Sequence, residues 1–306
     1  LEPSEPKQRD RTVPFTDQTP RALGEPKRLL LIQAFTLAES SPFYVPPPDQ
    51  SKEALLLNYK DFAPILADVA WDLHPGPVGP IGDSYVETRE EFALVGAARI
   101  PIVREACESG RYDAIVMLGG GDPGFTEARE IAQRHDIAVT SCAHSQMNIA
   151  SMLGNRFSVI DISEVHNMHY YNLVVQYRFT DRCASIRNVN YPLPRPSNPE
   201  AANIQSEKQA AIAGERSELL ERSLAEAVAA IEEDGAESVI LGCSAAFWMQ
   251  PFLQRRLNNM GWEVPVLEGY RTAIEMAKLL TNLDLSVSGL AFPSDNPRKW
   301  RQKKTF

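Results

Sequence analysis

The chain has 306 residues, of which 43% are hydrophobic and 23% are charged, a balance typical of globular proteins. This length predicts two domains or lobes, with a core large enough to fold without a disulfide or a metal. The formal net charge of −9 argues against a nucleic-acid-binding protein, because such proteins normally present a basic face. No apolar stretch approaches the ~18 residues of a membrane helix, so we expect neither a nucleic acid nor a membrane as partner.

Four cysteines lie far apart and form no CxxC pair, which excludes the spacing of a zinc finger. They are Cys107, Cys142, Cys183 and Cys243. No secretory leader is recognisable, and this cysteine usage predicts a reduced, cytoplasmic chain.

The ends of the chain differ in composition from its middle. Residues 1–26 hold five prolines among charges, which predicts a disordered or extended arm. Residues 296–306 are basic and are expected to form a solvated tail. Between them, the apolar run in residues 28–36, RLLLIQAFT, predicts the first buried strand.

Helices are expected next. Residues 54–69 form a helical stretch between two loops rich in proline and glycine, at 41–50 and 73–83. A second helical stretch covers residues 87–109, and Pro101 within it predicts a break or a kink.

From residue 112 onward, strand, turn and helix alternate. The expected strands are YDAIVM, IAVTS, RFSVIDIS, ESVIL and VPVL, with a loop at residues 190–205. One helix places five apolar residues on one face and pairs Glu218 with Arg222 one turn apart. Those apolar residues are Leu220, Leu224, Ala227, Val228 and Ile231. This alternation predicts an α/β fold with parallel sheets.

Open parallel sheets bind ligands at the carboxyl ends of their strands, which directs attention to three turns. The first holds Gly119, Gly120 and Gly121. The second begins at Cys142 and the third at Cys243. Since Cys243 precedes an expected helix N-terminus, it could be stabilised as a thiolate and act as an acid, a base or a nucleophile. The alternative is a small buried residue, as most free cysteines are.

Two other motifs are set aside. GGGDPG matches the dinucleotide fingerprint, but Asp122 would put a carboxylate against the pyrophosphate, and the next strand ends without an acidic residue for the ribose. His166 and His169 form an HxxH pair without a third ligand, so we expect ordinary core or surface histidines and no metal. His144 differs, because it follows a strand beside Cys142 and is a candidate for lining the site.

Five segments together carry a resemblance to a known family. They are GDPGFTEARE, MNIASMLGNRFSVI, DRCASIRNV, AIEEDGAESVILGCSA and VPVLEGYRTAIEMAKLL. With these in order, residues 28–292 resemble the aspartate/glutamate/hydantoin racemase superfamily, and most of all its hydantoin racemase branch. The resemblance implies two similar α/β lobes, each with a parallel sheet flanked by helices, around a cleft on a pseudo-twofold axis. It also implies no cofactor, no metal, a small-molecule substrate with a carbonyl or carboxylate, and a homo-oligomer.

The resemblance further implies a division into lobes and a pair of cysteines. Residues 27–140 with 264–295 would form the first lobe, and residues 141–263 the second. In the family, one cysteine from each lobe faces the acidic carbon of the substrate. Cys243 matches the second cysteine, whereas Gly119 stands in the place of the first, a pattern similar to that of arylmalonate decarboxylases.

Other family positions are altered as well. The opening NPNT-like turn reads QAFT, which leaves Thr36 and introduces the apolar Phe35. His144 aligns where the hydantoin branch often has a glutamate. The expected substrate-binding set is Thr36, Phe35, Gly119, Gly120, Gly121, Asp122, Ser244 and Ala245, with backbone N–H groups holding an enolate-like intermediate.

Three functions stay open on this basis. In the first, Cys243 works with His144 or Cys142 as acid and base in an isomerase, either a racemase or epimerase or a double-bond isomerase. In the second, a decarboxylase generates the carbanion and Cys243 alone protonates it. In the third, the chain is a non-catalytic or hydrolytic ligand-binding relative.

Overall fold

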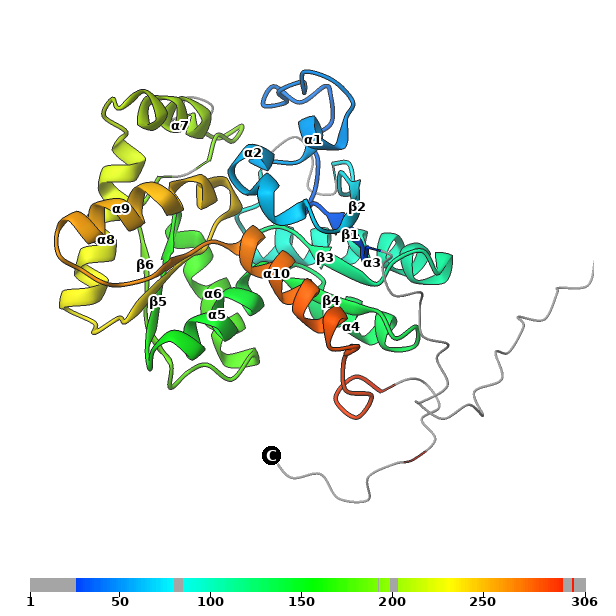
Figure 1. Cartoon of the computed structure of the whole chain (residues 1–306). Helices are drawn as coiled ribbons and strands as arrows, with labels where there is room; N and C mark the ends of the chain where they lie inside the picture. The colour runs from blue at the N-terminus through cyan, green and yellow to red at the C-terminus, as the bar shows by residue number, and fades with distance from the viewer. Residues whose placement is uncertain (1–25, 80–84, 192, 199–202, 294–298, 300–306) are drawn as a thin grey trace, which may run out of the picture.

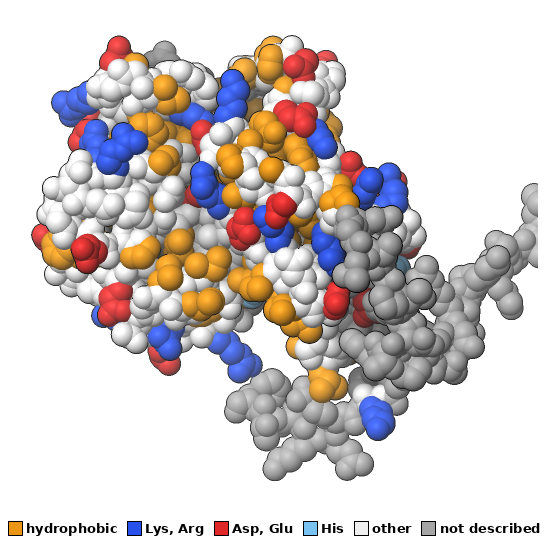
Figure 2. Space-filling model, viewed as in Figure 1, with side chains coloured by type: hydrophobic (Ala, Val, Ile, Leu, Met, Phe, Trp, Pro, Cys, Tyr) orange, Lys and Arg blue, Asp and Glu red, His pale blue; other side chains and the backbone are white. Residues whose placement is uncertain are grey.

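The computed structural model describes residues 26–79, 85–191, 193–198, 203–293 and 299. The expected N-terminal arm and C-terminal basic tail therefore lie almost entirely outside the described residues. Within the described residues, no helix is long and apolar enough to cross a membrane. Lysine, arginine, aspartate and glutamate side chains are interspersed over the face seen in Figure 2.

Two four-stranded sheets form the framework, and every strand pair in them is parallel. The first has the order β2-β1-β3-β4 and the second β6-β5-β7-β8, so the two orders correspond strand for strand. The first sheet contains β1 (Arg28–Ile32), β2 (Ala70–His74), β3 (Ala114–Met117) and β4 (Ala138–Ser141). The second contains β5 (Phe157–Asp161), β6 (Cys183–Asn188), β7 (Ser238–Leu241) and β8 (Val266–Leu267). The predicted α/β fold with two parallel sheets is confirmed.

Helices flank both sheets (Figure 1). Around the first sheet are α1 (Lys52–Leu55), α2 (Tyr59–Phe62), the 3₁₀ helix η1 (Ala63–Leu66), α3 (Arg89–Ser109) and α4 (Phe125–Gln133). Around the second are α5 (Cys142–Leu153), η2 (Glu164–His166), α6 (Asn167–Gln176), α7 (Ile204–Ala213), α8 (Glu218–Glu232), η3 (Ser244–Met249) and α9 (Gln250–Asn259). The last helix, α10 (Gly269–Asn282), runs between the two groups.

The chain passes from the first sheet to the second after β4, and it leaves the second sheet after β8. Because β8 pairs with β7, the return follows Leu267, a few residues after the boundary at 264 expected from the sequence. Helix α10 then packs on β3, β4 and α5, and the hydroxyl of Thr140 donates to the carbonyl of Ala273 at 2.8 Å. Apolar residues on the buried face of α10, such as Ile274 and Ala277, are fully covered.

Helix α3 is continuous through Pro101, so the expected break is wrong. Thr88 and Glu91 form a capping box at its start, and Gly110 ends it in the left-handed conformation. Val95 and Val103 are completely buried on either side of the proline. This packing and both caps hold the helix together despite the backbone bond that proline removes.

Several elements were not expected. The predicted helix at 54–69 is divided into three short helices, and β2, β6 and α6 were missed. The expected face of α8 is confirmed, since Leu220, Ala227 and Ile231 are buried.

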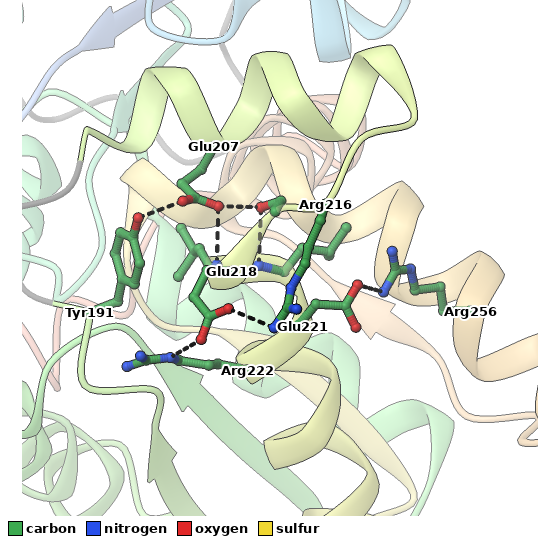
Figure 3. Close-up of polar contacts among 10 residues, drawn as sticks. Tyr191, Glu207, Arg216, Glu218, Glu221, Arg222 and Arg256 are labelled. Atoms are coloured by element: carbon green, nitrogen blue, oxygen red, sulfur yellow. Dashed lines mark hydrogen bonds and ion pairs between the residues drawn. The ribbon is translucent and has the colours of Figure 1, made fainter.

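Polar contacts connect α8 to its neighbours (Figure 3). Glu218 and Arg222 pair at 3.0 Å, as predicted. Glu207 on α7 accepts from the hydroxyls of Tyr191 at 2.7 Å and Ser217 at 2.6 Å. These bonds fix the start of α8 against the loop after β6.

Candidate active site

Two turns from different sheets meet at the centre of the molecule. Gly119 to Gly121 follow β3, and Gly242 and Cys243 follow β7. Gly120 lies so close to the carbonyl of Gly242 that a Cβ on Gly120 would collide with it. The hydroxyl of Tyr170 joins both turns, because it accepts from Gly121 N at 3.2 Å and donates to the carbonyl of Gly242. The strand ends singled out in the sequence thus form one region.

Gly119 has a backbone conformation that excludes a side chain. Its φ is +116°, and a Cβ placed on it would lie 2.7 Å from the Cβ of Ala34. Residues with side chains rarely adopt such a φ. A side chain at Gly119 is therefore disfavoured both by the backbone conformation and by the neighbouring Ala34.

The buried guanidinium of Arg99 holds the segments on both sides of the glycine turn. Arg99 on α3 is completely buried and donates to the carbonyls of Ile32 at 2.7 Å, Leu118 at 3.1 Å and Pro123 at 3.0 Å. It therefore fixes the ends of β1 and β3 and the far side of the turn relative to one another. Burial lowers the pKa of Arg99 to about 10, which leaves it charged at neutral pH.

Asp122 accepts hydrogen bonds from the N-terminus of α5. Its buried carboxylate accepts from the backbone N–H groups of Ala143 and His144, both at 2.8 Å, and from the hydroxyls of Ser141 at 2.7 Å and Tyr177 at 3.0 Å. A carboxylate at a helix N-terminus satisfies N–H groups that lack partners within the helix. The structure thus gives Asp122, an expected substrate ligand, four contacts within the protein.

Cys243 is partly exposed and is the N-cap residue of η3. Burial of the sulfur raises the pKa of this thiol, and the carboxylates of Asp161 and Glu87 raise it further. The N–H groups of Ala245 and Ala246 act in the opposite direction but do not outweigh these effects. These effects together favour the thiol over the thiolate, so of the roles considered from the sequence they favour that of an acid.

Cys142 is fully buried at the first turn of α5, with its Cβ facing Gly269. Burial raises the pKa of Cys142 far above its usual value, and the nearby Asp122 adds to the effect. Cys142 differs from Cys243 in having no exposed surface, which favours a packing role over contact with a substrate.

His144 lies in an aromatic slot between Phe125 and Tyr177, with both ring centroids 5.0 Å away. Burial and the charge of Arg129 lower the pKa of His144 to about 4. The imidazole is therefore neutral at neutral pH. The ring of His144 contacts Phe125, Tyr177 and Asn148, and these are not the groups that surround Cys243.

The remaining expected residues each have partners within the protein. Phe35 packs edge-on to Tyr85 at 6.5 Å. The backbone of Thr36 donates to Pro77 at 3.0 Å and pairs with Val78. Ser244 is hydrogen-bonded to Tyr270.

The backbone donors expected to hold an enolate are partly engaged already. The N–H of Gly119 is directed at the sulfur of Cys142, that of Gly121 at Tyr170, and that of Ala245 at Cys243. A substrate would have to replace these partners or use the other N–H groups of the two turns.

A cavity of about 210 Å³ opens next to Gly121 of the glycine turn, between α3, α4 and α6. Its lining includes Arg89, Phe92, Gly121, His169 and Tyr177, and does not include Cys243. The ring of His169 stacks on Phe92 with centroids 3.9 Å apart, and its Nε2 bonds to the carbonyl of Gly121 at 2.6 Å.

Two acidic groups near Cys243, Asp161 and Glu87, were missed in the sequence, and His166 beside them was expected to be an ordinary core or surface histidine. Asp161, at the end of β5, bonds through Oδ1 to Nδ1 of His166 at 2.9 Å, and Glu87 precedes α3. The rule that drew attention to Cys243, a functional group at a strand end, also applies to Asp161. Within the described residues, no group of three or more histidine, cysteine, aspartate or glutamate side chains could hold a metal ion.

These features define a class of protein: a two-sheet α/β protein in which turns that follow strands of both sheets meet, with Cys243 in one of them. The family model of Asp/Glu/hydantoin racemase matches residues 69–277, more than half of the sequence, and the chain belongs to this family.

Curated relatives agree with this assignment. The chain is 28% identical over 207 residues to a hydantoin racemase of Paenarthrobacter aurescens, covering 68% of this chain and 78% of the relative. It is 29% identical over 226 residues to a hydantoin racemase of a Pseudomonas species, strain NS671, covering 74% and 79%.

Solved structures support the fold. An allantoin racemase from Klebsiella pneumoniae superposes with a TM-score of 0.64 at 22% identity, covering 90% of this chain and 97% of the other. A glutamate racemase from Francisella tularensis superposes with a TM-score of 0.51 at 13% identity, covering 86% and 84%. At these identities the likeness concerns the fold alone.

Proposed function

We propose that this protein is a cofactor-independent isomerase that acts at an acidic carbon next to a carbonyl, with Cys243 as a proton carrier. The observation that supports the proposal is the close approach of Gly120 to Gly242, because Cys243 directly follows Gly242. Because the chain belongs to the Asp/Glu/hydantoin racemase family, racemisation or epimerisation is the first reaction to test. Because the curated relatives are hydantoin racemases, 5-substituted hydantoins are the first substrates to test.

The raised pKa of Cys243 fits a group that protonates a carbanion. A thiol donates its proton as an enolate-like intermediate collapses, and the N–H groups of Ala245 and Ala246 stabilise the thiolate that results. In the reverse direction the same thiolate is a strong base, because its conjugate acid is weak.

The second candidate is a decarboxylase in which Cys243 alone moves a proton. The conformation of Gly119 favours it, since no side chain is available at that place in the first lobe. In this reaction, loss of CO₂ would generate the carbanion, and a base on the opposite face would be unnecessary.

One experiment separates the two reactions. The protein is incubated in deuterated water with enantiopure 5-benzylhydantoin, and in parallel with phenylmalonate. An isomerase incorporates deuterium at the acidic carbon and loses optical rotation, whereas a decarboxylase releases CO₂ from the malonate. If neither deuterium exchange nor CO₂ release exceeds the rate without protein, the proposed function is contradicted.

A further inference from the structure

Three buried polar atoms without a protein partner lie near Cys243. They are Oε1 of Glu87, Oδ2 of Asp161 and Nε2 of His166. The three residues are 8%, 1% and 3% exposed, respectively. Most buried polar atoms in folded proteins have a partner, so this group indicates that a ligand or a reacting atom completes the site.

The imidazole of His166 is held in a defined orientation. Its Nδ1 bonds to Oδ1 of Asp161 at 2.9 Å, and Phe92 from the first lobe contacts the ring edge-on, with centroids 5.7 Å apart. A carboxylate at Nδ1 favours the neutral form whose proton is on that nitrogen. Nε2 then carries the lone pair, and a proton taken up by the ring is stabilised by the backbone carbonyl of Val86 as well as by Asp161.

The same carboxylate connects His166 to the turn that carries the thiol. Oδ2 of Asp161 lies directly against Gly242, the residue before Cys243. Glu87 reaches the group from the first lobe, and its other oxygen, Oε2, lies 3.5 Å from Arg195. The cluster of Glu87, Asp161 and His166 thus borders Cys243 with residues of both lobes.

We infer that His166 is the second proton carrier of the isomerase, acting through Nε2, and that Asp161 is its positioning residue. This inference rests on the proposed function of Cys243. It supplies the partner that the missing side chain at Gly119 cannot provide, from a different element of the fold.

The proton transfers balance in both directions. In one direction, neutral His166 takes the proton from the acidic carbon, and the C–H electron pair passes into the enolate. The thiol of Cys243 then gives its proton to the opposite face, which leaves an imidazolium and a thiolate. In the other direction, the thiolate removes the proton and the imidazolium delivers one.

The surroundings stabilise the charge that His166 would acquire. Burial by itself lowers the pKa of His166, but the carboxylate of Asp161 and, to a smaller degree, that of Glu87 raise it above its usual value. The imidazolium is therefore favoured beside these carboxylates. The thiol of Cys243, with its raised pKa, is the complementary acid.

The test follows solvent deuterium into each enantiomer of 5-benzylhydantoin separately. In His166→Gln we expect racemisation to fall by ~10²–10⁴-fold, and exchange of both enantiomers to fall with it, because Cys243 stays a thiol when no neighbouring base is present. In Cys243→Ala we expect exchange of one enantiomer only, because neutral His166 still accepts the proton from that face. The matched control is His135→Gln, in an exposed turn after α4, and it should behave as wild type.

A pH profile separates the role of Asp161 from a structural one. Exchange by Cys243→Ala reports on His166 alone. Adding Asp161→Asn removes the carboxylate that raises the pKa of His166, so the pH limb of this exchange should move to lower pH. A limb that stays in place contradicts the positioning role.

The outcomes distinguish this inference from the proposed function. If His166→Gln racemises at the wild-type rate, the inference is wrong while the role of Cys243 stands. The inference is also wrong if a folded Cys243→Ala, checked by its melting temperature, loses exchange of both enantiomers while wild type exchanges them, because His166 would then not act as a base. If wild type exchanges neither enantiomer, the proposed function fails, and the inference fails with it.

Discussion

At the scale of single residues, glycines determine how closely the two sheets approach. Gly120 contacts the carbonyl of Gly242, and Gly242 contacts the carboxylate of Asp161, so neither position has space for a side chain. Gly119 differs from both, because its φ of +116° disfavours a side chain even where a neighbour could move. Restoring a cysteine at Gly119 would therefore require a different turn, and not merely a different residue.

Gly119→Ala tests this constraint. We expect it to lower the free energy of unfolding by about 1–3 kcal/mol, because alanine would be forced into a disfavoured backbone conformation with its Cβ close to that of Ala34. Urea denaturation followed by circular dichroism measures the change.

The double variant Ala34→Gly with Gly119→Ala separates the two causes. Removing the methyl of Ala34 relieves the collision but not the backbone strain, so the double variant should recover only part of the loss. A Gly119→Ala protein as stable as wild type would show that the turn adopts another conformation.

At the scale of elements, the completely buried strands could be predicted and the half-buried strands β2 and β6 could not. Every residue of β3, β4, β5 and β7 is buried, and their sequences are accordingly rich in apolar residues. β2 and β6 lie at sheet edges and are mostly half-buried, so their sequences AWDLH and CASIRN mix polar and apolar residues without a clear period. A sequence pattern is weakest where the residues of a strand are only half-buried.

The parts of the candidate site that could be predicted are those that directly follow a recognisable strand. Cys243 and the glycine turn follow clearly apolar strands, which made them visible. His166 gains its significance from Asp161 and from an unbonded Nε2, and those depend on tertiary placement. His144 and Cys142 follow a strand as well, but the aromatic slot and the packing of α10 that enclose them are contributed by distant segments.

The start of α3 is joined to the second lobe by Arg195. Its guanidinium donates to Oε2 of Glu91 at 3.1 Å and to the carbonyl of Tyr85 at 3.0 Å, and it also pairs with Oε1 of Glu91. Arg195→Gln should lower the free energy of unfolding by about 1–2 kcal/mol, since the pair is largely buried and Glu91 would lose its counter-charge.

The same variant has a pH signature. Burial opposes ionisation of Glu91, but its bonds from Arg195 and from the N–H groups of Thr88 and Glu87 lower the pKa of Glu91 from 4.5 to about 2. A lowered carboxylate pKa gives stability that is present above pH 4.5 and is lost as the pH falls toward 2. In Arg195→Gln this acid-dependent loss should shrink, as measured by urea denaturation between these pH values.

Arg216→Gln is the matched control. Arg216 pairs with Glu218 at 3.2 Å, but its side chain is 79% exposed, so its removal should change stability by less than ~0.5 kcal/mol. Equal losses in the two variants would contradict the joining role of Arg195.

At the scale of the whole molecule, contacts far apart in the sequence hold the lobes together around the site. Tyr170 on α6 bonds to the turns after both β3 and β7. Lys208 on α7 pairs with Asp61 on α2 at 2.8 Å, so the segment between β1 and β2 also contacts the second lobe. The relative position of the two turns is therefore fixed on several sides.

The overall architecture followed from the alternation of strands and helices, whereas the interface between the lobes did not. Tyr170, Arg195 and Lys208 lie in segments that were expected to be loops or were left unassigned. Their importance comes from partners more than 70 residues away, such as Gly242 for Tyr170. The expected homo-oligomer and cytoplasmic location stay predictions.

The most direct test of the account is the turnover of Cys243→Ala compared with wild type, on the substrate that wild type converts. The account predicts a loss of ~10²–10⁴-fold in the rate of product formation, because a proton carrier is removed from the junction of the two sheets. Cys183→Ala, on the edge strand β6, should keep the wild-type rate. A Cys243→Ala protein that forms product as fast as wild type would contradict the account.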